Sequence, residues 1–133
     1  MTFPFRRDSG NGMVVVVVEL DKLQKMTVIL DTGASISTFD LTEMVMAGYD
    51  LSNPVGRTKI ETGNGVVETQ VYELQEIAAF GIVRKHFQIQ VYDFLAHGMV
   101  ADYQGMLGMD FFEGTKFCID TVQNQISIEL LPV

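Results

Sequence analysis

The sequence predicts an all-β domain, and three observations carry this prediction. Short runs rich in β-branched residues, of which the five valines at positions 14–18 are the clearest, favour strands over helices. Turn-forming Gly, Asn, Asp and Pro residues interrupt these runs at short intervals. Helical spacing of apolar residues is clear in one short segment, residues 41–47. Short strands, frequent turns and one or two short helices are typical of a β-sandwich or a β-barrel.

Length and composition indicate one folded domain. The chain has 133 residues, of which 47% are hydrophobic and 20% are charged, so it can bury a core without disulfides or metals. No linker and no repeat of fixed period divides the sequence. We expect residues 1–12 to form a flexible N-terminal segment or an edge strand, and residues 13–133 to form the domain.

Charge and cysteine content argue against several kinds of function. The 17 acidic residues outnumber the 9 basic ones, whereas proteins that bind nucleic acids through phosphates are normally basic. The single cysteine, Cys118, excludes an internal disulfide and a zinc site with several thiolates. Its apolar neighbours predict a small core residue. We therefore expect no nucleic-acid partner, no metal and no cofactor.

The sequence also bears on the compartment. The longest apolar run, residues 13–18, is far shorter than the roughly 20 residues of a membrane-spanning helix. The first dozen residues do not read as a secretory signal, because no apolar region of useful length follows the two arginines. We expect a cytoplasmic protein if the chain is complete, and a periplasmic or membrane-tethered one if an upstream segment has been removed.

The individual elements follow from local patterns. Asp40 can cap the helix over residues 41–47, with Glu43 as its capping-box partner, and Gly48 can end it. A hairpin tip is expected over residues 62–65, since Gly and Asn tolerate positive φ. After residue 105, an apolar strand passes into one helical turn that ends at Gly114. The predicted strands are residues 13–20, 26–30, 58–61, 66–74, 77–80, 86–92, 116–119 and 125–130.

One triplet has the features of a catalytic turn. Asp31-Thr32-Gly33 follows the apolar residues 28–30, so a carboxylate leaves a hydrophobic strand and enters a sharp turn. Such triplets also occur as ordinary turns between strands. Three further features favour a function. The small residues Ala34 and Ser35 leave room for a ligand backbone, a glycine-tipped hairpin lies downstream, and the block GMLGMDF begins at Gly105.

Together these segments resemble the retropepsin-like aspartic proteases. The matching residues are 28–35, with the Asp-Thr-Gly-Ala turn, 60–67, with the glycine-bearing flap, and 105–112, with a late hydrophobic-Gly motif before a short helix. Their order and spacing suit the whole chain. The late block and the helix over residues 41–47 look most like the bacterial single-domain members. The resemblance implies a closed β-barrel of the acid-protease type with one or two short helices.

The resemblance also implies roles for individual residues. Asp31 would be the catalytic carboxylate, and Thr32 would bond across a dimer axis to lock two active-site turns together. Gly33 would offer its carbonyl to a peptide substrate beside Ala34, Ser35 and Ile36. The flap tip would comprise Gly63, Asn64 and Gly65. Leu107 and Gly108 would support the active-site turn from beneath.

This mechanism requires two carboxylates that share one proton. The chain has one Asp-Thr-Gly, and the nearest other candidate, Asp120-Thr121-Val122, lacks the glycine and lies in a predicted surface turn. One chain therefore supplies half a site, and a homodimer would supply the other half. The activity implied is an aspartic endopeptidase. The alternative is a catalytically inactive domain of the same fold that acts as a dimerisation or peptide-binding module.

Other catalytic classes have weaker support. His86 and His97 are isolated from the Cys and clustered acids that a metal site would need. A Cys–His protease would need an exposed thiolate and a third orienting group. A glycoside hydrolase would need a second acid that one chain does not offer. Residues 63–65 are not a phosphate loop, because no Gly-Lys-Ser/Thr follows them.

Overall fold

The computed structural model describes residues 1–63, 65–97 and 103–130, and these residues form strands with few helices. The helices are α1 (Leu41–Met46) and two short 3-10 helices, η1 (Leu95–His97) and η2 (Met109–Phe112). The strands are β1 (Thr2–Pro4), β2 (Arg6–Arg7), β3 (Val14–Leu20), β4 (Gln24–Leu30), β5 (Thr38–Asp40), β6 (Gly56–Thr62), β7 (Gly65–Ala79), β8 (Ile82–Tyr92), β9 (Gly105–Leu107), β10 (Thr115–Asp120) and β11 (Gln125–Leu130). The prediction of an all-β chain with one short α-helix is confirmed.

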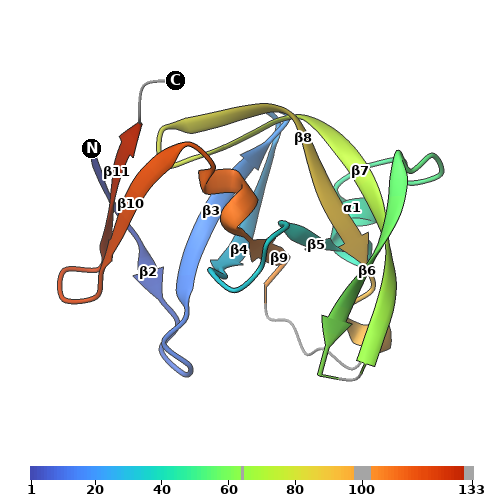
Figure 1. The fold of residues 1–133 in the computed structure, drawn as a ribbon, viewed down its shortest axis with the longest axis horizontal. Coiled ribbons are helices and arrows are strands. Elements are labelled where there is room, and N and C mark those ends of the chain that lie inside the picture. The colour runs from blue at the N-terminus through green and yellow to red at the C-terminus, as the bar shows by residue number, and fades with distance from the viewer. Residues whose placement is uncertain (64, 98–102, 131–133) are drawn as a thin grey trace.

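Six strands close into a barrel (Figure 1). Hydrogen bonding runs in the order β3-β4-β9-β5-β8-β7, and an additional pairing of β3 with β7 closes the ring. β2 extends the barrel sheet beside β3, and β6 extends it beside β7. The predicted closed β-barrel is therefore present.

The seam between β3 and β7 is short. It contains two residue pairs, Glu19 with Ala78 and Leu20 with Ile77. Asp21, which follows β3 directly, reinforces it: its backbone N–H donates to the Glu76 carbonyl at 2.8 Å, and its carboxylate accepts the Glu76 N–H at 2.9 Å. The Tyr49 hydroxyl, in the loop after α1, donates to the same carboxylate at 2.9 Å. This aspartate therefore joins three parts of the chain where the barrel closes.

The core lies inside the barrel. In β3, Val16, Val18 and Leu20 are buried, while Val17 on the opposite face is 59% exposed. This alternation follows from the period-2 geometry of a strand. Residues from β4, β5, α1, β7, β8, β9, η2 and β11 belong to the same apolar cluster.

The two strands expected over residues 77–80 and 86–92 are present with different bounds. Residues 77–79 end the long strand β7, and β8 begins at Ile82. The turn is Phe80-Gly81, with Ala79 paired to Ile82 and with φ of 51° and 72° at the two turn residues. A phenylalanine at positive φ is strained, but its ring packs against Phe3 at 6.0 Å and Phe112 at 6.4 Å between centroids.

The predicted helix is present, with one change at its start. Asp40 caps α1 by accepting the Glu43 N–H at 3.3 Å, as expected. In a capping box the Glu43 side chain would accept the Asp40 N–H, but here Gln104 takes that place. The Gln104 backbone carbonyl accepts the Asp40 N–H at 3.0 Å, and the Gln104 side-chain amide donates to the Glu43 carboxylate at 3.0 Å. Gly48 follows the helix with a φ of 96°. Gln104 thus ties α1 to the chain that enters β9.

A separate three-stranded sheet, in the order β1-β11-β10, contains the described ends of the chain (Figure 1). The first dozen residues pair in two places, β1 with β11 and β2 with β3. Asp8 also accepts a hydrogen bond from the Tyr103 hydroxyl. Of the two possibilities for this segment, the structure has the strands.

The prediction that Cys118 is a core residue is wrong, because the side chain is exposed on β10. Its neighbours Phe117 and Ile119 take the inward positions of the strand instead. Phe117 stacks on Phe112 with centroids 4.4 Å apart. Because successive side chains of a strand point to opposite faces, Cys118 lies on the face of β10 that points away from the core.

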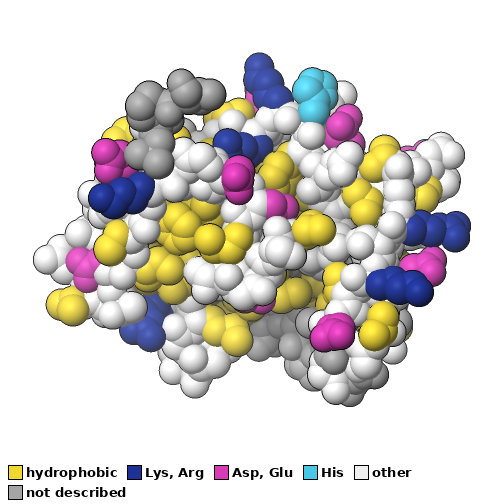
Figure 2. Space-filling model, in the orientation of Figure 1, with side chains coloured by type: hydrophobic (Ala, Val, Ile, Leu, Met, Phe, Trp, Pro, Cys, Tyr) yellow, Lys and Arg dark blue, Asp and Glu magenta, His cyan; other side chains and the backbone are white. Residues whose placement is uncertain are grey.

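On the face shown in Figure 2, the described acidic and basic side chains are scattered and form no large patch of one charge. The net charge of −8 is a property of the whole chain rather than of one site on this face. Among the described residues, no helix combines the length and apolar character needed to cross a membrane.

The central feature of the barrel is β9, which lies between β4 and β5. β9 is parallel to β4, through Ile29 with Met106 and Leu30 with Leu107, and antiparallel to β5. A side chain at Gly105 would not fit, since its Cβ would lie 2.6 Å from the Thr38 carbonyl oxygen. Glycine at this position is therefore a packing requirement.

We expect Gly105→Ala to destabilise the fold by about 1–3 kcal/mol, because backbone atoms must move to admit one methyl group. Gly56→Ala is the matched control in a strand: its Cβ would meet Val71 at an ordinary 3.9 Å. The control should change stability by less than about 0.5 kcal/mol. Urea unfolding of both variants measures the difference. Equal unfolding midpoints would contradict the close approach of β9.

Candidate active site

Asp31 lies directly after β4, and backbone hydrogen bonds hold it there. Its N–H donates to the Leu107 carbonyl at 2.9 Å, which extends the pairing of β4 with β9 by one residue. Its side-chain Oδ1 accepts the Gly33 N–H at 2.9 Å, and its carbonyl accepts the Ala34 N–H at 3.1 Å. A Cβ at Gly33 would lie 3.3 Å from the same Oδ1. The half-buried carboxylate therefore has a defined position.

The turn after Asp31 rests on the backbone of Gly108. A Cβ at Gly108 would lie 2.7 Å from the Ala34 carbonyl oxygen and 3.1 Å from the Ile36 carbonyl carbon. The same Ala34 carbonyl accepts the Met109 N–H at 2.8 Å. Leu107 is fully buried beneath the turn. In the structure, Leu107 and Gly108 thus lie next to the turn that follows Asp31.

A partly buried pair that no signal in the sequence marked, Ser37 and Asp110, braces this turn from η2. Asp110 accepts the Ser37 N–H at 2.9 Å through Oδ2 and the Ser37 hydroxyl at 2.7 Å through Oδ1. The Ser37 Oγ in turn accepts the Gly108 N–H at 2.9 Å. Burial raises the pKa of Asp110 above its usual value, although the bonds from Ser37 and the Phe111 N–H oppose that shift.

The Asp31 turn and the hairpin of β6 and β7 border one cleft of about 630 Å³, within the usual range for ligand sites. Of the residues predicted for the site, Asp31, Gly33, Ala34, Ser35, Ile36 and Gly63 line it. Thr32 is exposed and does not line the cleft. Gly65 ends the hairpin with a φ of 109° and is not among the lining residues. Asn64 lies outside the described residues.

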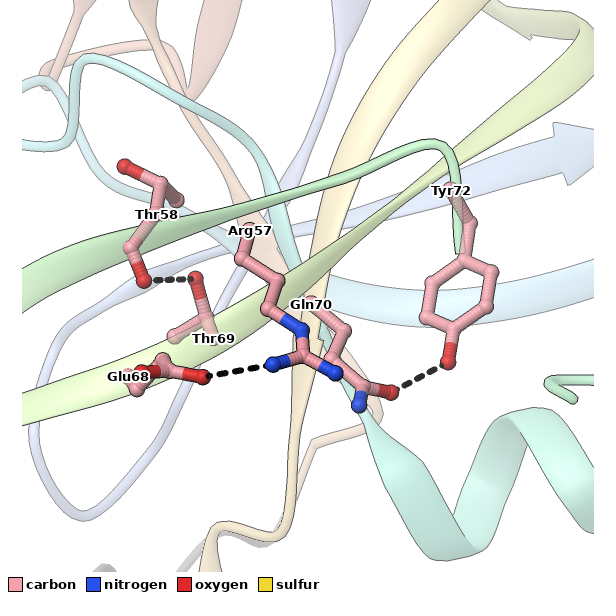
Figure 3. A network of polar contacts seen from close by, with 6 residues as sticks. All are labelled: Arg57, Thr58, Glu68, Thr69, Gln70 and Tyr72. Carbon is pink, nitrogen blue, oxygen red and sulfur yellow. Dashed lines mark hydrogen bonds and ion pairs between the residues drawn. The ribbon is translucent and has the colours of Figure 1, made fainter. Parts of the chain in front are cut away.

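The hairpin is fixed at its base and open at its tip. The Tyr72 hydroxyl lies 2.7 Å from the Leu51 carbonyl oxygen and 2.6 Å from the Gln70 Oε1, the second of these contacts being drawn in Figure 3. Nearer the tip, the ion pair of Arg57 with Glu68 spans 3.8 Å between two largely exposed side chains and adds little stability. A Cβ at Gly63 would meet no atom within 4 Å.

The cleft has further lining residues that sequence reasoning did not select. They are Thr38, Lys59, Ile60, Glu61, Gln90, Tyr92 and Met106. Thr38 and Gln90 are paired in register between the parallel strands β5 and β8. Met106 lies on β9, inside the GMLG block. No local motif marks the residues on β5 and β8, since their position depends on the long-range pairing of strands.

The described residues hold no group of three His, Cys, Asp or Glu side chains arranged to bind a metal ion. His86 is exposed, with Nδ1 3.8 Å from a carboxylate oxygen of Glu73. The His97 side chain lies outside the described part of the structure. Asp120, the weaker candidate for a second carboxylate, accepts the N–H groups of Val122 and Gln123 in a turn.

Comparison with known proteins identifies first the fold and then the family. The structure is similar to that of a retropepsin-like aspartic protease from Rickettsia conorii, with a TM-score of 0.72 and 21% sequence identity over 96% of this chain and 90% of that one. The aspartyl protease family model matches residues 14–111. The chain therefore belongs to the aspartyl protease family and has the retropepsin-like fold. No curated protein matches it.

The hydrogen-bonded pair of Ser37 and Asp110 should contribute less to the free energy of unfolding as the pH rises. Because the pKa of Asp110 is raised in the folded state, the folded chain binds this proton more tightly than the unfolded chain does. The resulting stabilisation is present at low pH and is lost as the pH rises through the raised pKa. The free-energy advantage of the wild type over Asp110→Asn should therefore shrink as the pH rises above 3.8.

Asp120→Asn is a control in which the free-energy difference from the wild type should change with pH in the opposite direction. Hydrogen bonds from the Gln123 and Val122 N–H groups lower the pKa of Asp120, so its stabilisation is lost as the pH falls. Urea unfolding at several pH values measures both differences. A wild-type advantage over Asp110→Asn that grows with pH would contradict the assignment of Asp110 as a carboxyl whose ionisation opposes folding.

Proposed function

We propose that the protein is an aspartic endopeptidase, with Asp31 as its catalytic carboxylate. The observation that carries this proposal is the position of Asp31 in the cleft, at the end of β4 and across the cleft from a glycine-bearing hairpin. Membership of the aspartyl protease family supports it. Gly33 and Ala34 line the cleft and carry little or no side chain, so their backbone is accessible to an extended peptide.

The chemistry uses two carboxylates that share one proton, because two like charges at close range do not both ionise. The ionised carboxylate takes a proton from a water molecule as the water attacks the scissile carbonyl carbon. The protonated carboxyl donates its proton to the carbonyl oxygen. Transfer of a proton to the amide nitrogen then allows the C–N bond to break. The enzyme forms no covalent bond to the substrate.

The second carboxylate comes from a second copy of the chain, across a two-fold axis. Within one chain, the carboxylates of Asp110 and Asp120 are occupied by hydrogen bonds in other places. Glu61 lines the cleft but is exposed on β6, with no hydrogen bond to the described residues that would fix it. Thr32, exposed beside Asp31 and outside the cleft lining, is suited to a contact with the partner's turn.

The hairpin of β6 and β7 acts as a flap over the bound peptide. Its base is tied to the loop after α1 by the Tyr72 hydroxyl and by a hydrogen bond from the Val55 N–H to the Val71 carbonyl at 2.8 Å. Its tip reaches the cleft at Gly63 and has free space around it. This combination of a fixed base and an unpacked tip supports a closing motion.

Asp31→Asn should lower peptide hydrolysis at acidic pH by at least about 100-fold, because it removes the group that moves protons. Asp120→Asn is the control, since both hydrogen bonds to Asp120 end at one oxygen that asparagine retains. Rates are measured by mass spectrometry on unstructured peptides. If wild type and Asp31→Asn behave alike, the protein is a binding or dimerisation module rather than a protease.

Mixing the two proteins tests the dimer. Excess Asp31→Asn protein added to a fixed amount of wild type should reduce the rate, since each mixed dimer has one intact carboxylate. Sedimentation velocity at the assay concentration reports the association directly. A wild-type protein that is monomeric and fully active under these conditions would refute the shared site.

Gly63→Phe should reduce turnover while leaving the melting temperature unchanged. The open space at this position accommodates a side chain in the uncovered hairpin, but a ring at the cleft-lining tip obstructs closure over a peptide. Steady-state kinetics and thermal unfolding measure the two effects. Unchanged kinetics would count against the flap assignment.

A further inference from the structure

One wall of the cleft is made by alternate residues of two neighbouring strands. On β5 and β8, Phe39, Ile89 and Val91 point into the apolar core, and the residues between them point the other way. Thr38, Gln90 and Tyr92 are those intervening residues, and all three line the cleft. Their residual exposure is 3%, 3% and 5%, so this wall is polar but nearly closed to water.

Gln90 has a side-chain amide of which the oxygen, but not the nitrogen, has a hydrogen-bond partner among the described residues. Its Oε1 lies 3.3 Å from the Thr38 hydroxyl, which also lies 3.2 Å from the Ile36 carbonyl oxygen, and its backbone N–H donates to the Ser37 carbonyl at 3.0 Å. The side-chain nitrogen has no hydrogen-bond partner among the described residues. No described side-chain nitrogen or oxygen is both fully enclosed and unpaired. The free amide N–H groups of Gln90 therefore open into the cleft that it lines.

This arrangement is unusual for a strand residue with so little exposure. Because no enclosed side-chain nitrogen or oxygen of the described residues lacks a partner, these N–H groups reach solvent in the free protein, and an apolar ligand that covers them would leave them unpaired at a cost in free energy. A ligand atom that accepts a hydrogen bond removes the cost. The wall at Gln90 thus distinguishes ligands by whether they carry an acceptor at this depth.

We propose that Gln90 is a specificity-determining residue that selects peptides with a neutral hydrogen-bonding side chain, a carboxamide above all, at the position that contacts this wall. The inference rests on the proposed function and names the class of peptide it acts on. A carboxamide oxygen accepts from the Gln90 amide, while its own nitrogen remains able to donate to an oxygen of the cleft. The residues beside Gln90 on this wall, Thr38, Tyr92 and Met106, carry no positive charge to pair with a carboxylate, and the lysine among the lining residues, Lys59, lies on the hairpin strand β6.

The expected discrimination is about tenfold between a peptide with asparagine and one with leucine, which has nearly the same shape but no acceptor. The position on the peptide is found first, by locating the bonds cleaved in a mixed peptide digest. Peptides are then made in which each site around the scissile bond carries either Asn or Leu. The ratio of kcat/KM within each pair is the measurement.

Gln90→Met tests the residue, because methionine has similar length and no hydrogen-bonding amide. It should lower the Asn/Leu ratio by about tenfold at one peptide position. Gln88→Met is the matched control, with the same substitution on the same strand, two residues away and exposed. Its ratio should equal that of the wild type. A wild type that prefers leucine at every position, or a Gln90→Met protein with the wild-type ratio, overturns the proposal.

Binding to the Asp31→Asn protein separates this inference from the proposed catalysis. Fluorescence anisotropy with labelled Asn and Leu peptides should show the same preference without turnover, and Gln90→Met in that background should abolish it. Equal binding of both peptides overturns the specificity proposal even where the wild type cleaves them. Preferential binding of the Asn peptide by a protein that never cleaves would leave Gln90 assigned and remove the protease assignment.

Discussion

The position of Asp31 depends on the close passage of β9 between β4 and β5. At Gly105 and Gly108 the backbone of this segment comes so near to its neighbours that a methyl group would lie within 2.6 and 2.7 Å of carbonyl oxygens. That proximity allows the Leu107 carbonyl to hold the Asp31 N–H, and Ser37 to bridge Gly108 and Asp110. The turn after Asp31 is thus held by backbone geometry and one partly buried polar pair rather than by the side chains that face the cleft.

Much of the fold could be predicted because its elements obey local rules. The valine-rich strand β3, the cap at Asp40, the glycine after α1 and the hairpin around residues 62–65 each carry a signal within a few residues. The Asp-Thr-Gly turn and the GMLG block were recognisable for the same reason, since glycine is required where backbones approach closely. The structure explains that requirement for Gly105 and Gly108 in the late block.

The rest could not be predicted because it depends on contacts between distant segments. Phe80 occupies a turn position that favours Asn or Gly, and packing against Phe3 and Phe112 offsets the strain. Whether the Cys118 side chain is buried or exposed depends on which face of β10 packs against the barrel. Gln90 reads as one residue of a buried strand until its pairing with Thr38 puts it on the cleft wall. Such residues become visible when the sheet order is known.

The sheet order also has a consequence for how the protein acquires its site. The hairpins β3–β4, β7–β8 and β10–β11 join neighbours in sequence, so their loops close at small entropic cost. The pairings that place β9, β5 and β8 beside Asp31 instead join strands that are far apart along the chain: β4 with β9, β5 with β8 and β5 with β9. Such contacts form slowly, because the intervening chain must be ordered first. We therefore expect the turn that carries Asp31 to take shape late in folding, so that a half-folded chain, however rich in strands, lacks the organised centre that the proposed cleavage of peptides needs.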